Sequence, residues 1–268
     1  MTKTRRTESG MPYFHFGSGE PLLLIHGLGE FKEGWVHQFE LSDEFELIIP
    51  DLRGHGEYAK TEGISIQSFA SDLIGLLKEL SLDSAHILGF SMGGAVAQEM
   101  YRQAPDKCRS LLLINTFHYF PKKLAKMFLK SRESKIESLT VEPRYEEAAK
   151  LSLYSWKEEN IRDFSNFYQP NRDAFLASMN ACLHVNNLSL LPNVQIPTLI
   201  IGGQYDSVLP VSLQLWMHKL MPDSEFIIMR NTGHMPKYEA KDRFNRLIRN
   251  FLRKQKASTR RKRFNASA

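Results

Sequence analysis

The amino-acid sequence predicts a single α/β domain with a mostly parallel β-sheet, and three observations lead to this prediction. Apolar runs of strand length alternate with stretches of helical period, which is typical of a parallel sheet covered by helices on both faces. Most of these runs are continuously apolar, as strands buried on both faces are. The chain has 268 residues, of which 42% are hydrophobic, and this is enough for one sizeable core.

Seven strands are expected in chain order, at 13–16, 22–26, 46–50, 86–89, 111–115, 198–201 and 225–229. Three helices are expected between or after them. The first spans 65–80, where apolar residues recur at helical spacing, and the second runs from Gly94 toward Arg102 and ends before Pro105. The last places these residues on one face: Phe244, Leu247, Ile248, Phe251 and Leu252.

Residues 117–192 interrupt the alternation, because they offer short amphipathic segments and no convincing strand. We therefore expect one discontinuous core at 11–116 and 193–253, with a helical cap inserted at 117–192. The cap is rich in aromatic residues that could form either its own core or the apolar wall of a pocket. They are Phe117, Tyr119, Phe120, Phe128, Tyr154, Trp156, Phe164, Phe167 and Tyr168.

The net charge of +5 comes from the C-terminal end of the chain, where seven lysines and arginines lie between 253 and 263. A short terminal run of like charge is typical of a solvated end, so we expect a disordered tail at 254–268 and no specific nucleic-acid partner. Two distant cysteines, Cys108 and Cys182, predict neither a disulfide framework nor a zinc site. With no apolar leader and no run long enough to span a membrane, the expected location is cytoplasmic.

The pattern Gly89-Phe90-Ser91-Met92-Gly93 stands between an expected strand and an expected helix. The chain must reverse there within a few residues, and glycine on either side of Ser91 leaves room for strand and helix to approach. Such a turn strains the serine and projects its hydroxyl outward. Ser91 is therefore the predicted nucleophile.

A serine hydroxyl needs a base, and the base needs an acid that orients it; on an elbow of this kind both follow later in the chain. Among the downstream histidines, only His234 lies in a glycine- and proline-bounded loop after a late strand; His118 and His184 fall in the cap, and His218 in a helix. Asp206 follows the strand at 198–201 and is the predicted acid. Asp223 precedes a strand and is interpreted as a turn residue.

Acyl transfer also needs hydrogen-bond donors for the developing oxyanion, and two backbone amides commonly supply them. The N–H of Met92, at the start of a helix, is one candidate. The second is the N–H of Leu28, in the glycine-rich loop 26–29 after an early strand. His26 ends that strand and more often packs and hydrogen-bonds locally than catalyses.

Together these motifs resemble the α/β-hydrolase fold superfamily, in order and spacing, over almost the whole chain. Residues 26–29 look like its oxyanion loop, 51–56 like the turn after its fourth strand, 89–94 like its elbow, and Gly233-His234 with Glu239 like its histidine loop. The resemblance implies the same catalytic set, Ser91, Asp206 and His234. This sequence departs from the family's pattern at two positions: Phe90 stands where many members carry His, and Ala240 stands where proline is frequent. Neither position supplies a catalytic group.

The leading hypothesis is hydrolysis of a carboxylic ester or lactone of a small-molecule substrate, through an acyl-serine. Cleavage of a C–C bond, thioester or amide on the same residues stays open, as does a signalling protein that binds its ligand in a hydrolase site. A nucleotide cofactor is not expected. The dinucleotide-binding pattern that Gly27 and Gly29 could begin requires a third glycine at position 32, which is lysine here, and the sequence contains no P-loop. No metal is expected either, and the oligomeric state is left open.

Overall fold

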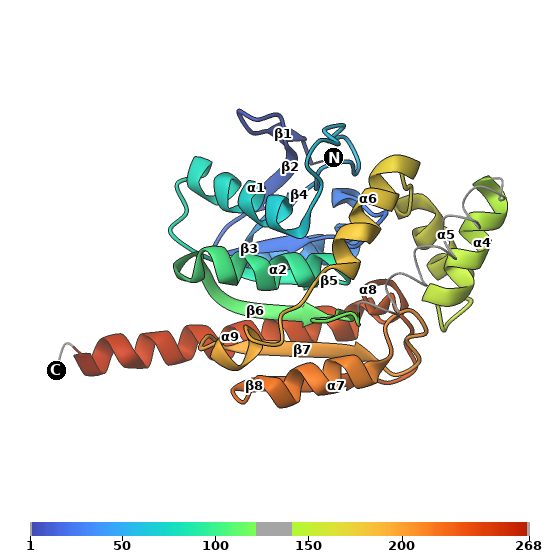
Figure 1. Ribbon diagram of the computed structural model, residues 1–268. Coiled ribbons are helices and arrows are strands. Elements are labelled where there is room, and N and C mark those ends of the chain that lie inside the picture. The colour runs from blue at the N-terminus through green and yellow to red at the C-terminus, as the bar shows by residue number, and fades with distance from the viewer. Residues whose placement is uncertain (1, 122–140, 267–268) are drawn as a thin grey trace.

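The computed structural model describes residues 2–121 and 141–266, which build an eight-stranded sheet (Figure 1). Across the sheet the strands run in the order β1-β2-β4-β3-β5-β6-β7-β8. β1 and β2 are antiparallel to their neighbours, and every pair from β4 to β8 is parallel. The predicted mostly parallel sheet is therefore confirmed. The bounds are β1 (Arg5–Arg6), β2 (Pro12–Gly17), β3 (Glu20–Ile25), β4 (Phe45–Pro50), β5 (Ala85–Phe90), β6 (Cys108–Ile114), β7 (Thr198–Gly203) and β8 (Ser224–Met229).

Helices cover both faces of the sheet, and each face has its own apolar core. α1 (Ile66–Glu79), α2 (Met92–Gln103) and α7 (Val211–Leu220) contribute to the core that contains Leu23 of β3. The 3₁₀ segment η1 (Lys32–Asp43) and α9 (Lys241–Ala266) contribute to the opposite core, which contains Leu22 and Leu24 (Figure 1). Neighbouring strand residues point to opposite faces, so a continuously apolar strand feeds both cores.

Local signals in the sequence begin and end these helices. Ser65 caps α1: its side chain accepts a hydrogen bond from the Ser68 N–H, and the Ser68 hydroxyl accepts one from the Ser65 N–H, each at 3.0 Å. This reciprocal pair satisfies two amides that a helix start otherwise leaves unpaired. α2 ends at Gln103, two residues before Pro105, which begins the short 3₁₀ turn η2 (Pro105–Lys107).

The strand order also determines where a site can form. From β3 the chain first moves outward to β4 and then returns to the other side of β3 to form β5. Ligands of open α/β sheets bind outside the carboxyl ends of the strands at such a reversal. The loop at 26–29 follows β3 and Ser91 follows β5, so both lie at this point.

In the described part of the chain between β6 and β7, three helices lie at the edge toward which the strands point: α4 (Val141–Ser152), α5 (Glu158–Phe167) and α6 (Arg172–Leu183) (Figure 1). The short turn η3 (Leu191–Asn193) leads back to the sheet. In the described part of 117–192 the only pairing of strand type is an isolated bridge between Tyr119 and Asn186. Phe128 lies outside the described residues.

The C-terminal end differs from expectation. Residues 254–266, expected to be disordered, continue α9 as helix to Ala266, and Figure 1 shows this helix extending past the sheet. The segment 241–266 contains neither glycine nor proline and is rich in Lys and Arg, which favour helix, so no residue that ends helices interrupts α9. Among the described residues no helix combines the length and apolarity needed to cross a bilayer.

Candidate active site

Ser91 occupies a sharp turn between β5 and α2, and its backbone has φ 52° and ψ −118°. This is an unusual conformation for a residue with a side chain, and the surroundings hold it. The Ser91 N–H donates to the Ile114 carbonyl at 2.9 Å, and the Thr116 hydroxyl donates to the Ser91 carbonyl at 2.6 Å. A Cβ on Gly89 would collide with the carbonyl of Gly93, so glycine is required where strand and helix approach.

The structure brings Ser91, His234 and Asp206 together from three separate loops. His234 Nε2 lies 3.0 Å from Ser91 Oγ, and His234 Nδ1 lies 2.8 Å from Asp206 Oδ2. The carboxylate accepts from Nδ1–H, which leaves Nε2 free to accept the serine proton. Asp206 and His234 are buried, while Ser91 is half-buried and reaches the cavity. The arrangement can therefore move a proton from the hydroxyl to the imidazole.

Backbone and side-chain donors hold the Asp206 carboxylate in place. Its Oδ1 accepts from the N–H groups of Val208 and Leu209 at 2.9 and 2.8 Å, and its Oδ2 also accepts from Asn115 Nδ2 at 2.9 Å. Hydrogen bonds to both oxygens fix the orientation of the carboxylate toward His234. The contact between Asn115 and Asp206 was not predicted from the sequence, because the two residues are 91 positions apart in the chain.

His26 and its neighbours hold the loop that contains Leu28. The Leu52 N–H donates to His26 Nε2 at 3.0 Å, so the proton is on Nδ1, which donates to the Gly27 carbonyl at 2.8 Å. Burial moves the pKa of His26 well below its usual range, which keeps the ring neutral. Because a trans peptide directs C=O and N–H to opposite sides, holding the Gly27 carbonyl also directs the N–H of Leu28.

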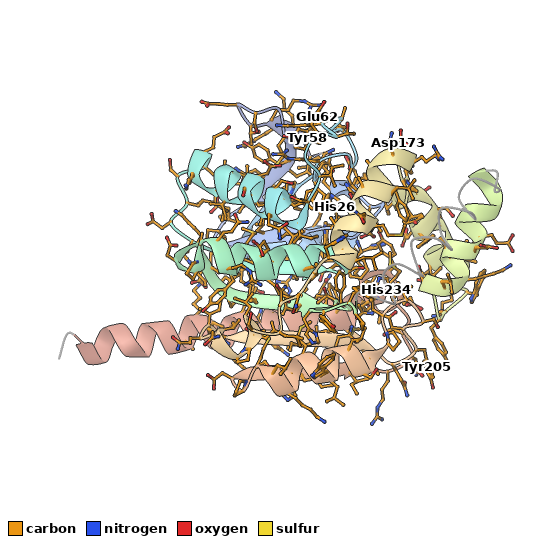
Figure 2. The ribbon with its side chains drawn as sticks, in the orientation of Figure 1. His26, Tyr58, Glu62, Asp173, Tyr205 and His234 are labelled. Carbon is orange, nitrogen blue, oxygen red and sulfur yellow. The ribbon has the colours of Figure 1, made fainter. Side chains whose placement is uncertain are left out.

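Leu28 and Met92 both line the cavity beside Ser91. Met92 is the first residue of α2, so its N–H has no partner within the helix and lies at the positive end of the helix dipole. Figure 2 shows His26 and His234 at the same end of the sheet. One predicted amide donor lies in the loop after β3 and the other at the first residue of the helix after β5, so both follow strands at the reversal of strand order.

A cavity of about 210 Å³ opens at Ser91 and is enclosed mainly by apolar side chains. Four of the aromatic residues singled out in the sequence line it: Phe117, Phe120, Phe164 and Tyr168. Tyr119, Tyr154, Trp156 and Phe167 do not line it. α6, for which the sequence offered no lining prediction, adds Phe175, Met179, Cys182 and Leu183. Its apolar face could not be assigned from sequence because α6 is apolar on more than one side.

The other downstream histidines do not line the cavity at Ser91. His118 is buried and edge-on to Trp216, with ring centroids 4.7 Å apart, and burial lowers its pKa to about 4. His184 is exposed, and His218 bonds Ser224 Oγ at 2.7 Å at the far end of α7. Glu239, part of the histidine loop, accepts from the Gly233, Tyr154 and Ser155 N–H groups at 2.7 to 2.8 Å, and so joins that loop to the segment after α4.

Comparison with known proteins agrees with the fold. A family model described as alpha/beta hydrolase fold matches residues 20–241, which is most of the chain. This chain belongs to the α/β-hydrolase fold family. The hydrolase is similar in structure to a thermophilic esterase from Thermogutta terrifontis, with a TM-score of 0.84 and 28% identity over 95% of this chain and 97% of that one.

Curated relatives of this α/β hydrolase include enzymes whose names indicate different substrates. Lipase 1 of Psychrobacter immobilis is 28% identical over 84% of this chain and 74% of its own length. A 2-hydroxy-6-oxononadienedioate/2-hydroxy-6-oxononatrienedioate hydrolase of a Pseudomonas species is 26% identical over 88% of this chain and 89% of its own. The relatives therefore support a hydrolase without choosing between these substrates.

Proposed function

We propose that this α/β hydrolase cleaves a carboxylic ester or lactone of a small to medium, partly apolar substrate through an acyl-serine intermediate. The observation that carries the proposal is the chain of contacts from Ser91 Oγ to His234 Nε2 and from His234 Nδ1 to Asp206, opening on an apolar cavity. Ester hydrolysis needs these parts and no cofactor.

In the proposed reaction His234 takes the proton of Ser91 as the hydroxyl attacks the carbonyl carbon, and Asp206 stabilises the resulting imidazolium. The N–H groups of Leu28 and Met92 bind the oxyanion. His234 then gives its proton to the leaving alkoxide, which leaves an acyl-serine. Water hydrolyses the acyl group by the same steps, with His234 as base. Helices α4 to α6 act as the cap that gives the acyl group its pocket.

A C–C hydrolase is the second candidate, and the Pseudomonas relative favours it. The substrate in that relative's name is a dianion, which would need cationic partners when desolvated. Among the described residues, those lining the cavity include no lysine or arginine, and Glu30 is the only carboxylate. This composition supports an uncharged acyl group and therefore favours the ester over a dioate.

The test is a substrate panel of p-nitrophenyl esters of increasing acyl length, lactones, thioesters and a dicarboxylate diketone, with a fluorophosphonate probe as active-site label. We expect turnover of esters with uncharged acyl groups, and loss of both turnover and labelling in Ser91→Ala. His234→Ala should lower kcat by about 10⁶-fold. Labelling that persists in Ser91→Ala would contradict the assignment of Ser91 as nucleophile. Faster turnover of the diketone than of the esters would favour the C–C hydrolase. If the wild-type protein turned over no substrate, a signalling role would be favoured.

A further inference from the structure

A buried ion pair lies beside the active site and has no part in the proton transfer described above. Lys237 Nζ lies 2.8 Å from Glu30 Oε1, and the two side chains are 0% and 2% exposed. The Tyr238 hydroxyl donates to the same Glu30 oxygen at 3.1 Å, and Lys237 Nζ also donates to the Gly34 carbonyl at 3.0 Å. Two buried charges are costly to desolvate, so their place in the fold calls for a physical explanation.

The pair connects the two loops that carry the proposed chemistry. Glu30 follows Leu28 by two residues, and its second oxygen, Oε2, accepts the Gly27 N–H at 3.1 Å. Lys237 belongs to the short helix α8 (Pro236–Glu239), which begins two residues after His234. The ion pair therefore ties the start of the oxyanion loop to the helix that follows the histidine.

Its contacts also reach the residue before the nucleophile. Lys237 Nζ lies 5.1 Å from the centre of the Phe90 ring, and that ring lies 5.0 Å from the ring of His234. Glu30 itself lines the cavity. An unpaired carboxylate at this place would repel an oxyanion, and a carboxylate held by Lys237 does so far less.

We propose that Lys237, acting through Glu30, is a positioning residue for the oxyanion hole: it neutralises Glu30 and holds it where its carboxylate orients Gly27 and hence the N–H of Leu28. This inference rests on the proposed function. The Gly27–Leu28 segment is then held on both sides, by His26 on the Gly27 carbonyl and by Glu30 on the Gly27 N–H. A fixed donor direction serves the transition state more than the bound substrate, because the oxyanion develops only during the reaction.

The test compares Lys237→Met with Lys32→Met. Lys32 is an equally buried lysine whose Nζ lies 3.0 Å from the buried Asp51 and also pairs with the partly exposed Glu33 and Glu57. The control therefore removes a buried lysine whose partners do not include Glu30, the carboxylate that accepts the Gly27 N–H. Active sites are counted by fluorophosphonate titration, and kcat, KM and the affinity of a boronic acid that forms a tetrahedral adduct are measured. For Lys237→Met we expect kcat to fall about 10- to 100-fold, KM to change less than about 3-fold, and boronic acid affinity to fall in parallel with kcat/KM.

Two further variants keep the proposal falsifiable if Lys237→Met does not fold. Glu30→Gln combined with Lys237→Met keeps an acceptor for the Gly27 N–H and removes both charges, so kcat should return to within about 3-fold of wild type. Tyr238→Phe removes only the hydroxyl that contacts Glu30 and should lower kcat a few-fold with unchanged KM. Unchanged kcat per titrated site in Tyr238→Phe, or equal losses in Lys237→Met and Lys32→Met, would overturn the proposal.

The failure of this proposal can be told apart from that of the proposed function. Wild-type protein that neither reacts with the fluorophosphonate nor hydrolyses any ester would contradict the proposed function, and the positioning role with it. Normal wild-type labelling and turnover, with a Lys237→Met enzyme whose kcat and boronic acid affinity are unaltered, would contradict the positioning role alone.

Discussion

Asn115 donates a hydrogen bond from Nδ2 to the same oxygen of Asp206 that bonds His234, and its backbone has φ 43° at the end of β6. The same amide nitrogen lies 3.0 Å from the Gly233 carbonyl, and Asn115 Oδ1 accepts the Gly203 N–H at 3.1 Å. One side chain thus connects the ends of two strands with the loop that carries the histidine. Asparagine tolerates the left-handed conformation better than most residues, which suits it to this position.

Asn115→Asp should impair the enzyme although the two side chains have nearly the same shape. It replaces a donor to Asp206 with a second carboxylate, and the added negative charge favours the protonated, inactive imidazole. We expect roughly a tenfold loss of kcat/KM at pH 7 and a shift of the acid limb of the pH–rate profile to higher pH. Asn193→Asp adds the same charge at an exposed site and should leave the profile unchanged. If the acid limb of the pH–rate profile were unchanged in Asn115→Asp, the contact between Asn115 and Asp206 would have no effect on the pH dependence of catalysis.

The same glycine-to-alanine substitution should have opposite effects on stability at the turn before Ser91 and at an exposed helix position. Gly89→Ala places a Cβ against the backbone of Gly93 and should abolish activity and lower the melting temperature. Gly75, exposed on α1, has nothing within 4 Å of its would-be Cβ. Gly75→Ala should therefore stabilise the protein by about 0.5–1 kcal/mol with normal kcat. Thermal unfolding and ester turnover check both, and an active, stable Gly89→Ala enzyme would contradict the steric argument.

Glu239→Gln tests the link between the histidine loop and the segment after α4. Its two carboxylate oxygens accept three backbone N–H groups, whereas an amide would turn its own NH₂ toward at least one of them. We expect a stability loss of about 1–3 kcal/mol and a lower kcat. Glu225→Gln removes an exposed carboxylate that pairs with Lys254 at 3.0 Å and should cost about 1 kcal/mol or less. Equal effects of the two variants on kcat would argue against the link.

Buried neutral histidines should make stability depend on pH. Burial lowers the pKa of His55 and of His118 to about 4, from an ordinary value of 6.5. Below pH 6.5 these histidines take up protons in the unfolded chain but stay neutral in the folded chain. The free energy of unfolding therefore decreases as the pH falls from 6.5 toward about 4. Each histidine contributes up to about 1.4 kcal/mol per pH unit.

Urea unfolding between pH 7 and 4 measures this slope, and His118→Leu should reduce it by about one proton. His184→Gln, which changes an exposed histidine, is the matched control and should leave the slope as in wild type. A slope unaffected by His118→Leu would mean that His118 takes up its proton in the folded state.

Much of the fold followed from pattern alone. Apolar runs predicted seven of the eight described strands, the helical spacing of apolar residues predicted the helix at 65–80, and Pro105 predicted the limit of the next helix. The two-residue strand β1 (Arg5–Arg6) carries exposed arginines and no apolar signal. The expectation of a disordered tail rested on its charge and left out its helix propensity, and the structure continues α9 to Ala266.

The sequence by itself determined that Ser91 stands on a glycine-flanked turn and that Asp206 and His234 follow later strands, because strand, turn and glycine signals are local. Only the tertiary structure decided that these three side chains lie within hydrogen-bond distance of one another, since that depends on strand order and on the packing of distant loops. The same holds for Asn115, Glu30 and Lys237. A polar or charged residue in a loop is usually solvated, and burial with a partner far away in sequence leaves no local trace.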